Sequence, residues 1–410
     1  MKRNLKISQY TFQIMQVQRE RYLSLLDSGR DRNDVIKVIT GMRRVGKSTL
    51  LNQYIDRLKN EDISEDHIFL VNFESIEFQH ICDNNALNRW IADNIPKDGQ
   101  NYVFLDEIQN VEGWEKSVSG LQIMQNCDIY ITGSNSKMPS SELATHISGR
   151  YVEIKVYPLS FREYLYLHPS DDIEKRFTDF LKYGGLPAVD PDSDETFIYG
   201  MLEGIFNTIL IKDILSRLKT DDVSKLTSIS RFLYSNIGNT TNIDNIAKTT
   251  GISNPTVSKY VDEMCMAYLF HYSERYDIVG KRYLKTNGKY YTSDLGLRNV
   301  MLSNFEGRDI SRPLENIVYL ELLRRGYSVR VGNYNDWEID FTASKPEGTE
   351  YFQICRTLMS ADTYEREIRP LRKIKDNFPK TVLTLDRLGL GSDDGIKIVN
   401  IIDWLLEKDG

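Results

Sequence analysis

The sequence has few cysteines, and they are scattered. Its 410 residues include Cys82, Cys127, Cys265 and Cys355, and no two of them form a CxxC pair. Structural zinc sites and disulfide frameworks depend on closely spaced cysteines. The sequence therefore indicates neither, and this cysteine usage favours a reducing compartment.

Long apolar segments are also missing. The first residues, MKRNLKISQYTF, lack the apolar stretch of a signal peptide. No segment approaches the roughly 18 consecutive apolar residues that indicate a transmembrane helix. We therefore expect a cytoplasmic protein that does not span a membrane.

Basic charge is not in excess. The formal net charge is −7 at pH 7, which argues against strong non-specific binding of nucleic acid over the whole surface. A local basic patch is compatible with this charge.

The length and the 40% hydrophobic content indicate two or three globular domains.

What the chain does contain is a phosphate-binding pattern. Residues 35–55 read VIKVITGMRRVGKSTLLNQYI, so a β-branched strand leads into GMRRVGKS and then into a helix. Glycine lets backbone N–H groups turn inward at a positively polarised helix N-terminus, where phosphates bind. A chance glycine-containing turn is the alternative. We predict ATP binding by Gly41, Met42, Arg43, Arg44, Val45, Gly46, Lys47, Ser48 and Thr49, with Lys47 on the β- and γ-phosphates and Ser48 on Mg²⁺.

A second pattern follows about sixty residues later. Residues 102–107 read YVFLDE, a buried strand that ends in two carboxylates, as in the Walker B motif. We expect Asp106 to bind Mg²⁺ through water and Glu107 to polarise the attacking water. A solvated Asp-Glu pair at a strand end is the alternative.

Two further catalytic residues are predicted from position. In additional-strand P-loop ATPases, a polar residue after the next strand, here residues 127–132, contacts the γ-phosphate; Ser134 or Asn135 fits, and we select Asn135, although both also favour turns. Arg150 precedes the strand at residues 151–156 and is a candidate arginine finger. That role requires a homo-oligomer, whereas a carboxylate partner in its own domain is the alternative.

The order of motifs resembles a known family. GMRRVGKSTLL, YVFLDEIQNVEGW, SGRYVEIKVYPLSFREY and YGGLPAV resemble the ATPase half of a prokaryotic AAA-type family with a C-terminal domain of unknown function. The resemblance implies an α/β fold with ATP binding, a winged-helix segment and a degenerate nuclease-like end. We expect an AAA-type core at residues 1–160, a helical lid at 161–220, a winged-helix domain at 221–300 and a restriction-endonuclease-like α/β domain at 301–410.

The middle of the second half suggests DNA contact. Residues 243–250, the turn at Gly251 and residues 254–261 follow a helix-turn-helix pattern, and residues 272–292 are predicted to form a hairpin that turns at Asn287-Gly288. Acidic Asp262 and Glu263 would repel a duplex, and winged helices also dock proteins. DNA and a protein therefore both remain candidate partners. The candidate DNA contacts are Thr256, Ser258, Lys259, Lys281, Arg282, Lys285 and Lys289.

The C-terminal part lacks part of a nuclease site. Glu315 and Asp340 fit the carboxylate positions of restriction-endonuclease-like folds, but the Glu-x-Lys position reads Gln353-Ile354-Cys355. Neither Gln353 nor Cys355 supplies the missing charge. We therefore expect a module that does not cleave.

Three functions remain open on these residues. The first is a Mg²⁺-dependent ATPase switch that couples hydrolysis to a nucleic-acid or protein partner. The second is a nucleotide-dependent scaffold that does not hydrolyse ATP. The third is an ATP-licensed DNA-processing nuclease.

Overall fold

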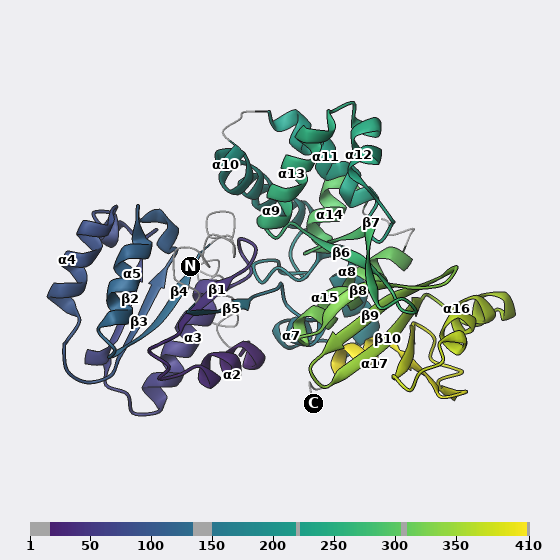
Figure 1. Ribbon diagram of the computed structural model, residues 1–410, viewed down its shortest axis with the longest axis horizontal. Coiled ribbons are helices and arrows are strands. Elements are labelled where there is room, and N and C mark those ends of the chain that lie inside the picture. The colour runs from purple at the N-terminus through teal and green to yellow at the C-terminus, as the bar shows by residue number, and fades with distance from the viewer. Residues whose placement is uncertain (1–16, 134–149, 219–221, 305–309, 408–410) are drawn as a thin grey trace. The chain divides into compact units, whose positions relative to one another are not determined.

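A computed structural model describes residues 17–133, 150–218, 222–304 and 310–407. The side chains of residues 285 and 286 also lie outside this description. The chain forms two compact units (Figure 1). The first contains residues 1–158, 211–219 and 266–268, and the second contains residues 159–210, 220–265 and 269–410. The predicted lid, residues 161–220, is shared between the two units.

The first unit is a three-layer α/β structure. Its described elements are α2 (Glu20–Ser28), β1 (Ile36–Thr40), α3 (Lys47–Asn60), η1 (Glu65–His67), β2 (Ile68–Asn72), η2 (Ile76–Phe78), α4 (Asn84–Asn94), β3 (Asn101–Asp106), η3 (Ile108–Asn110), α5 (Trp114–Ile123), β4 (Cys127–Thr132), β5 (Tyr151–Lys155), α10 (Ser216–Leu218) and most of the π-helical η5 (Ile209–Leu215).

All five strands of this unit are parallel, in the order β2-β3-β4-β1-β5. Every residue of β1, β3 and β4 is buried, which agrees with their high content of apolar residues, because helices cover both faces of a parallel sheet. Helix α4 packs beside α5, and α2 packs beside α3 (Figure 1). The predicted α/β core is confirmed, and the structure shows that its sheet is parallel.

The second unit combines helices with a mixed sheet. Its described elements are α7 (Phe161–Leu167), α8 (Ile173–Tyr183), α9 (Glu195–Thr208), α11 (Val223–Ser235), α12 (Ile243–Thr250), α13 (Asn254–Met266), β6 (Phe270–Asp277), β7 (Arg282–Thr292), α14 (Leu295–Leu302), α15 (Ser311–Arg324), β8 (Ser328–Tyr334), β9 (Trp337–Lys345), β10 (Gly348–Cys355), α16 (Ala361–Lys373), β11 (Lys380–Thr384), β12 (Gly391–Asp393), β13 (Ile396–Asn400) and α17 (Ile401–Leu406).

One eight-stranded sheet runs through this unit, in the order β12-β13-β11-β10-β9-β8-β6-β7. Strands β6 and β8 are parallel neighbours, so the hairpin predicted for a winged helix and the strands predicted for a nuclease-like module share one sheet.

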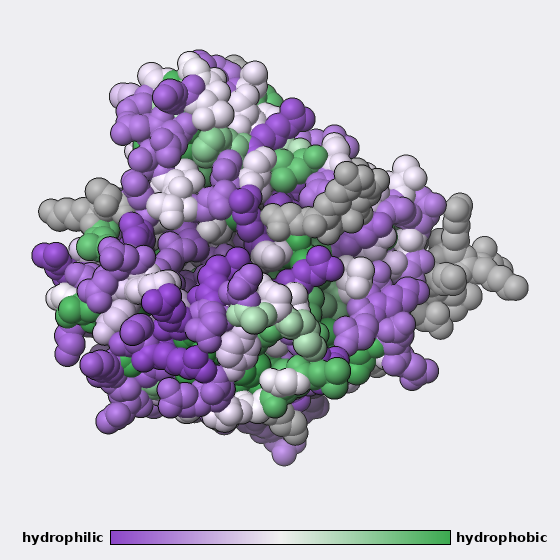
Figure 2. Space-filling view, turned by 90° about the vertical axis from the view of Figure 1, so that its right-hand side faces the viewer, coloured by the Kyte–Doolittle hydropathy of each residue, from purple (hydrophilic) through white to green (hydrophobic). Residues whose placement is uncertain are grey.

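The face of the molecule in Figure 2 is mainly hydrophilic, with smaller apolar areas between the polar side chains.

The hairpin turns at a different place from the one predicted. Strands β6 and β7 are joined by residues 278–281, where the Asp277 carboxylate accepts hydrogen bonds from the backbone of Val279 (3.1 Å) and Gly280 (3.0 Å). Asn287 and Gly288 lie inside β7, across from a register shift between Ser273 and Arg275. The predicted Asn-Gly turn is therefore wrong, because a bulge absorbs the positive φ of Asn287.

A buried carboxylate connects two segments of this unit that are distant in sequence. Asp294 accepts hydrogen bonds from the backbone of Gly185 (2.8 Å) and of Leu297 (3.1 Å), and it caps α14. Burial raises its pKa to about 6. Gly184 lies against it with φ of 79°, and a Cβ at this position would stand 2.2 Å from Asp294 Oδ1.

We predict that Gly184→Ala lowers the free energy of unfolding by about 3 kcal/mol or more, because both the backbone angle and the contact with Asp294 exclude a methyl group. Gly200→Ala is the matched control: an added Cβ in α9 meets nothing within 4 Å, so a gain of about 0.5–1 kcal/mol is expected. Urea unfolding followed by circular dichroism measures both. Equal stability of the two variants would contradict the role given to Gly184.

Candidate functional site

The loop between β1 and α3 has a backbone that requires glycine. Gly41 has φ of 145°, and a Cβ there would lie 2.3 Å from the carbonyl oxygen of Val156. Gly46 is left-handed at φ 95°, and Arg44 also has a positive φ of 70°. These angles curl the chain into a compact loop immediately before α3, as the P-loop pattern predicts.

Helix α3 begins at Lys47, so its first N–H groups face this loop. The first turn of any helix has N–H groups without intrahelical acceptors, and the helix dipole makes that end positive. The N-cap residue is Gly46, which has no side chain that could satisfy these groups. The arrangement suits an anion such as a phosphate.

Lys47 is buried inside the loop. Its ammonium donates to the carbonyl oxygens of Gly41 (3.1 Å) and Met42 (3.3 Å). Burial lowers its pKa, although the nearby charge of Glu107 opposes that effect. An ammonium that has lost hydration has a strong need for anionic partners, and phosphate oxygens would supply them.

The two residues predicted to hold Mg²⁺ lie together. The Thr132 hydroxyl donates to the Asp106 carboxylate, which also accepts from Asn72 Nδ2 at 2.9 Å. Ser48 lies near enough to this carboxylate to oppose the rise of its pKa. Asp106 is only 2% exposed, and burial raises its pKa. A hydroxyl and a carboxylate are hard oxygen ligands, so this pair fits Mg²⁺.

Glu107 follows β3 in a left-handed conformation, with φ of 56°. Its backbone N–H donates to Thr132 Oγ1 at 2.9 Å, and its side chain accepts a hydrogen bond from Gln109. The charge of Glu107 acts on both Lys47 and Arg43. Gln109, which donates to this carboxylate, is an orienting residue that the sequence did not single out.

The loop arginines differ in environment. Arg44 is exposed, whereas Arg43 binds the buried carboxylate of Asp213 through two hydrogen bonds, of 2.9 and 3.1 Å. Glu74 lies 3.6 Å from the Arg43 guanidinium on its exposed side. Asp213 stands 170 residues away in the sequence, so no local pattern pointed to it.

Arg19 supports the loop from outside. Its guanidinium donates to the carbonyl oxygens of Val45 (3.1 Å) and Tyr157 (2.9 Å), and the side chain is 5% exposed. Arg19 therefore connects the P-loop with the chain after β5. Arg19 and Val45 are 26 residues apart in the sequence, and no local pattern predicted this contact.

The two remaining catalytic candidates are less defined. Asn135 and its alternative Ser134 lie outside the described residues. Arg150 is exposed, and its carbonyl oxygen accepts a hydrogen bond from Ile36 N at the start of β1 (3.0 Å). An exposed arginine can reach a neighbouring copy of the protein. The γ-phosphate contact of Asn135 and the arginine-finger role of Arg150 both stay predictions.

Among the predicted DNA contacts, Lys289 has a buried side chain that is paired with carboxylates. Its ammonium binds Glu315 (2.9 Å) and Glu338 (2.8 Å), and its side chain is 4% exposed. Burial alone would lower the pKa of Lys289, but the charges of Glu315, Asp340 and Glu338 raise it overall. A lysine held in this way cannot meet a phosphate, and the prediction for Lys289 is wrong.

The other candidate contacts keep an open surface. Lys259, Lys281 and Arg282 are exposed, and Arg282 lies 3.4 Å from Asp277. Thr256 and Ser258 are half-buried on α13, and Thr256 shares a hydroxyl contact of 2.9 Å with Ser253. The side chain of Lys285 lies outside the description.

Lys289 joins the carboxylates that a nuclease-like fold would use. Burial and the charge of Glu315 raise the pKa of Asp340 well above its usual value. Gln353 donates to Glu367 at 2.8 Å instead of facing an open site. In the described parts of the chain, no three His, Cys, Asp or Glu side chains are grouped closely enough to hold a metal ion.

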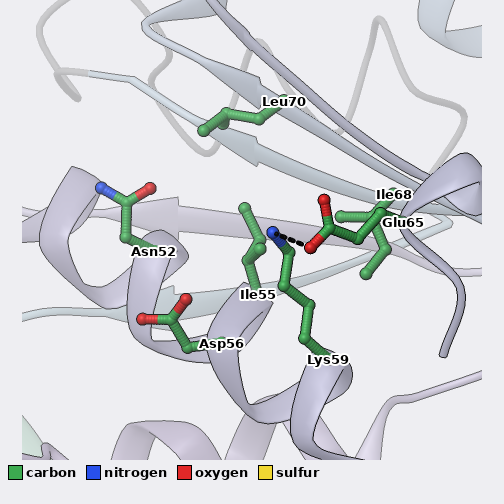
Figure 3. Close-up of a pocket in the computed structure, with 7 residues that line it drawn as sticks. All are labelled: Asn52, Ile55, Asp56, Lys59, Glu65, Ile68 and Leu70. Carbon is green, nitrogen blue, oxygen red and sulfur yellow. Dashed lines mark ion pairs between the residues drawn. The ribbon is translucent and has the colours of Figure 1, made fainter. Parts of the chain in front are cut away.

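A pocket of about 270 Å³ lies elsewhere on the first unit (Figure 3). Residues of α3, η1 and β2 line it, and Lys59 pairs with Glu65 across it at 3.0 Å. Its lining begins at Asn52, beyond the phosphate-binding motif.

Across the ranges that the structure describes, no helix is long and apolar enough to cross a membrane.

Comparison with known proteins identifies two successive family matches in this chain. Residues 33–165 match the family model described as "AAA domain", and residues 174–308 match "Domain of unknown function (DUF8612)". An uncharacterized protein of Haemophilus influenzae is 42% identical over 401 residues, which cover 95% of this chain and 99% of that protein. Uncharacterized protein MJ1544 of Methanocaldococcus jannaschii is 30% identical over 397 residues, 90% of this chain and 85% of that protein.

Among solved structures, the Aeropyrum pernix Orc1 protein in complex with DNA aligns over 70% of this chain and 92% of that chain, at 12% identity and a TM-score of 0.31. That score is too low to support an argument. The sequence identity to the two relatives, and the large share of each chain that aligns, establish the family. This chain belongs to one protein family with the Haemophilus influenzae and Methanocaldococcus jannaschii proteins, and in this chain an AAA domain is joined to a domain of unknown function.

Proposed function

We propose that the first unit binds and hydrolyses ATP with Mg²⁺, and that the second unit couples this cycle to a nucleic-acid or protein partner in the cytoplasm. The observation that carries the proposal is the ammonium of Lys47, which is buried inside the loop and donates to the carbonyl oxygens of Gly41 and Met42. Ser48 follows it on α3, and the buried carboxylate of Asp106 stands at the end of β3. These three groups match the ligands that a Mg²⁺-bound triphosphate requires.

Each residue has a defined task in this proposal. The loop N–H groups and Lys47 would bind the β- and γ-phosphates. Ser48 and Asp106 would hold Mg²⁺, which would supply positive charge next to the phosphate oxygens. Glu107 orients the attacking water and accepts its proton. Asn135 contacts the γ-phosphate, and Arg150 of a neighbouring copy stabilises the charge of the transition state.

For the second unit we propose a winged helix built from α11, α12, α13 and the β6–β7 hairpin. Thr256, Ser258 and Lys259 would face the groove of a duplex, and Lys281, Arg282 and Lys285 would meet phosphates. The rest of the sheet is proposed to be nuclease-derived and inactive. This is supported by Gln353 and Cys355 and by the Lys289 ammonium among the carboxylates.

We predict that Lys47→Ala weakens ATP binding about tenfold to a hundredfold, because it removes a charged donor to the phosphates. Glu107→Gln should keep ATP affinity and lower turnover at least about a hundredfold. Calorimetry and phosphate release measure the two effects. Lys59→Ala, on the exposed part of the same helix, is the control and should match the wild type. Equal turnover in all four proteins would exclude the ATPase proposal and leave a nucleotide-dependent scaffold.

We predict that Arg150→Ala preserves ATP affinity but lowers turnover by at least about a hundredfold, since an arginine finger acts mainly in the transition state. Turnover of the wild type should also rise with protein concentration as copies associate. Lys155→Ala, at the other end of β5, is the control. A monomer with full activity would contradict the finger role.

We predict that Lys281→Glu with Arg282→Glu weakens duplex DNA binding and reduces the slope of log affinity against log salt by about 2, because about 0.9 counterion is released per phosphate contact. Binding is measured by fluorescence anisotropy over a salt series. Lys373→Glu with Lys397→Glu changes the net charge equally at exposed positions outside this hairpin. The same slope in both double variants would remove the hairpin from the DNA proposal.

A further inference from the structure

Two short segments from the later part of the chain belong to the first unit. One contacts the P-loop, and the other contacts the residue just before it. Residues 211–219 and 266–268 belong to the first unit, although the chain on either side of each belongs to the second. The Tyr268 hydroxyl lies 2.9 Å from Thr40 Oγ1, and Thr40 directly precedes Gly41. Asp213, in the other segment, binds Arg43 within the loop.

The contact between Asp213 and Arg43 is strong and protected from water. Arg43 Nε and Nη2 donate to the two carboxylate oxygens at 3.1 and 2.9 Å, the bidentate geometry that arginine prefers. The Asp213 side chain is 3% exposed and the Arg43 side chain is 18% exposed. The hydrogen bond to Asp213 is the main cause that raises the pKa of Arg43.

Asp213 also acts electrostatically on the lysine proposed to bind phosphate: its charge opposes the lowering of the Lys47 pKa by burial. The cations that would receive a triphosphate therefore already have an internal anion close to them. The charge of Glu107, the residue proposed to orient the attacking water, also raises the pKa of Arg43. A γ-phosphate placed beside Glu107 would therefore be attracted to the Arg43 guanidinium.

We propose that Asp213 competes with the γ-phosphate of ATP for Arg43, so that ATP binding releases residues 211–218 from the P-loop. The inference rests on the proposed ATP binding and adds the route by which the second unit senses it. A γ-phosphate repels the Asp213 carboxylate and attracts the Arg43 guanidinium. By linkage, whatever pulls residues 211–218 away from the loop strengthens ATP binding by the same factor.

The conformation of this segment suits such a switch. Asp213 lies in η5, a stretch of π-helix within Ile209–Leu215. The π-helix is a rare conformation that is frequently found at functional sites. A segment in this conformation has nearby alternative hydrogen-bonding patterns, so it can rearrange when its anchor at Arg43 is lost.

The test compares nucleotide affinities of the wild type and Asp213→Asn by calorimetry, with AMPPCP as the triphosphate probe and ADP as the diphosphate probe, both with Mg²⁺. The variant removes the competing charge, so it should bind AMPPCP about tenfold more tightly and ADP with less than about a twofold change. Glu74→Gln is the matched control, because Glu74 also lies near Arg43 but is 54% exposed at its side chain. Its affinities should stay within about twofold of the wild type, since water screens that charge.

Hydrogen exchange of the wild type provides a second readout that does not need the variant. The amides of residues 211–218 should exchange faster with AMPPCP than with ADP. Unchanged or weaker AMPPCP binding by Asp213→Asn, or no difference in exchange between the nucleotides, would overturn the inference while leaving ATP binding intact. Failure of the wild type to bind either nucleotide would overturn both this inference and the proposed function.

Discussion

The site depends on β1 being held between two parallel neighbours. Strand β1 pairs with β4 on one side and β5 on the other, so its end delivers the loop to a fixed position at the edge of the sheet. The fit is close enough that Gly41 touches the backbone at Val156. The carboxylate of Asp106 reaches the same edge from β3, because the carboxyl ends of parallel strands lie together.

Both units contain buried lysines that are paired with carboxylates. In the first unit the ammonium of Lys37 on β1 pairs with Asp128 on β4, and both side chains are almost completely buried. In the second unit Lys289 is enclosed by Glu315 and Glu338. Removal of one partner from such a pair leaves an isolated buried charge, which is far more destabilising than the loss of an exposed pair.

The carboxylates predicted for a nuclease-like module take part in buried contacts. Glu315 pairs with the Lys289 ammonium from β7, burial and the charge of Glu315 raise the pKa of Asp340, and Gln353 donates a hydrogen bond to Glu367. The same lysine was the least suitable of the predicted DNA contacts. One burial event therefore accounts for both observations.

The sequence alone determined the local chemistry: the strand, loop and helix of the P-loop, the strand that ends at Asp106, and the α/β core. These follow from hydrophobic periodicity and from glycines at fixed spacing, which act over a few residues. Tertiary structure alone decided the partner of Arg43, the burial of Lys289, the place of the β6–β7 turn and the sharing of one sheet across the second unit. Each of these depends on contacts between residues far apart in the chain, such as Arg43 and Asp213, and no local pattern encodes such a pairing.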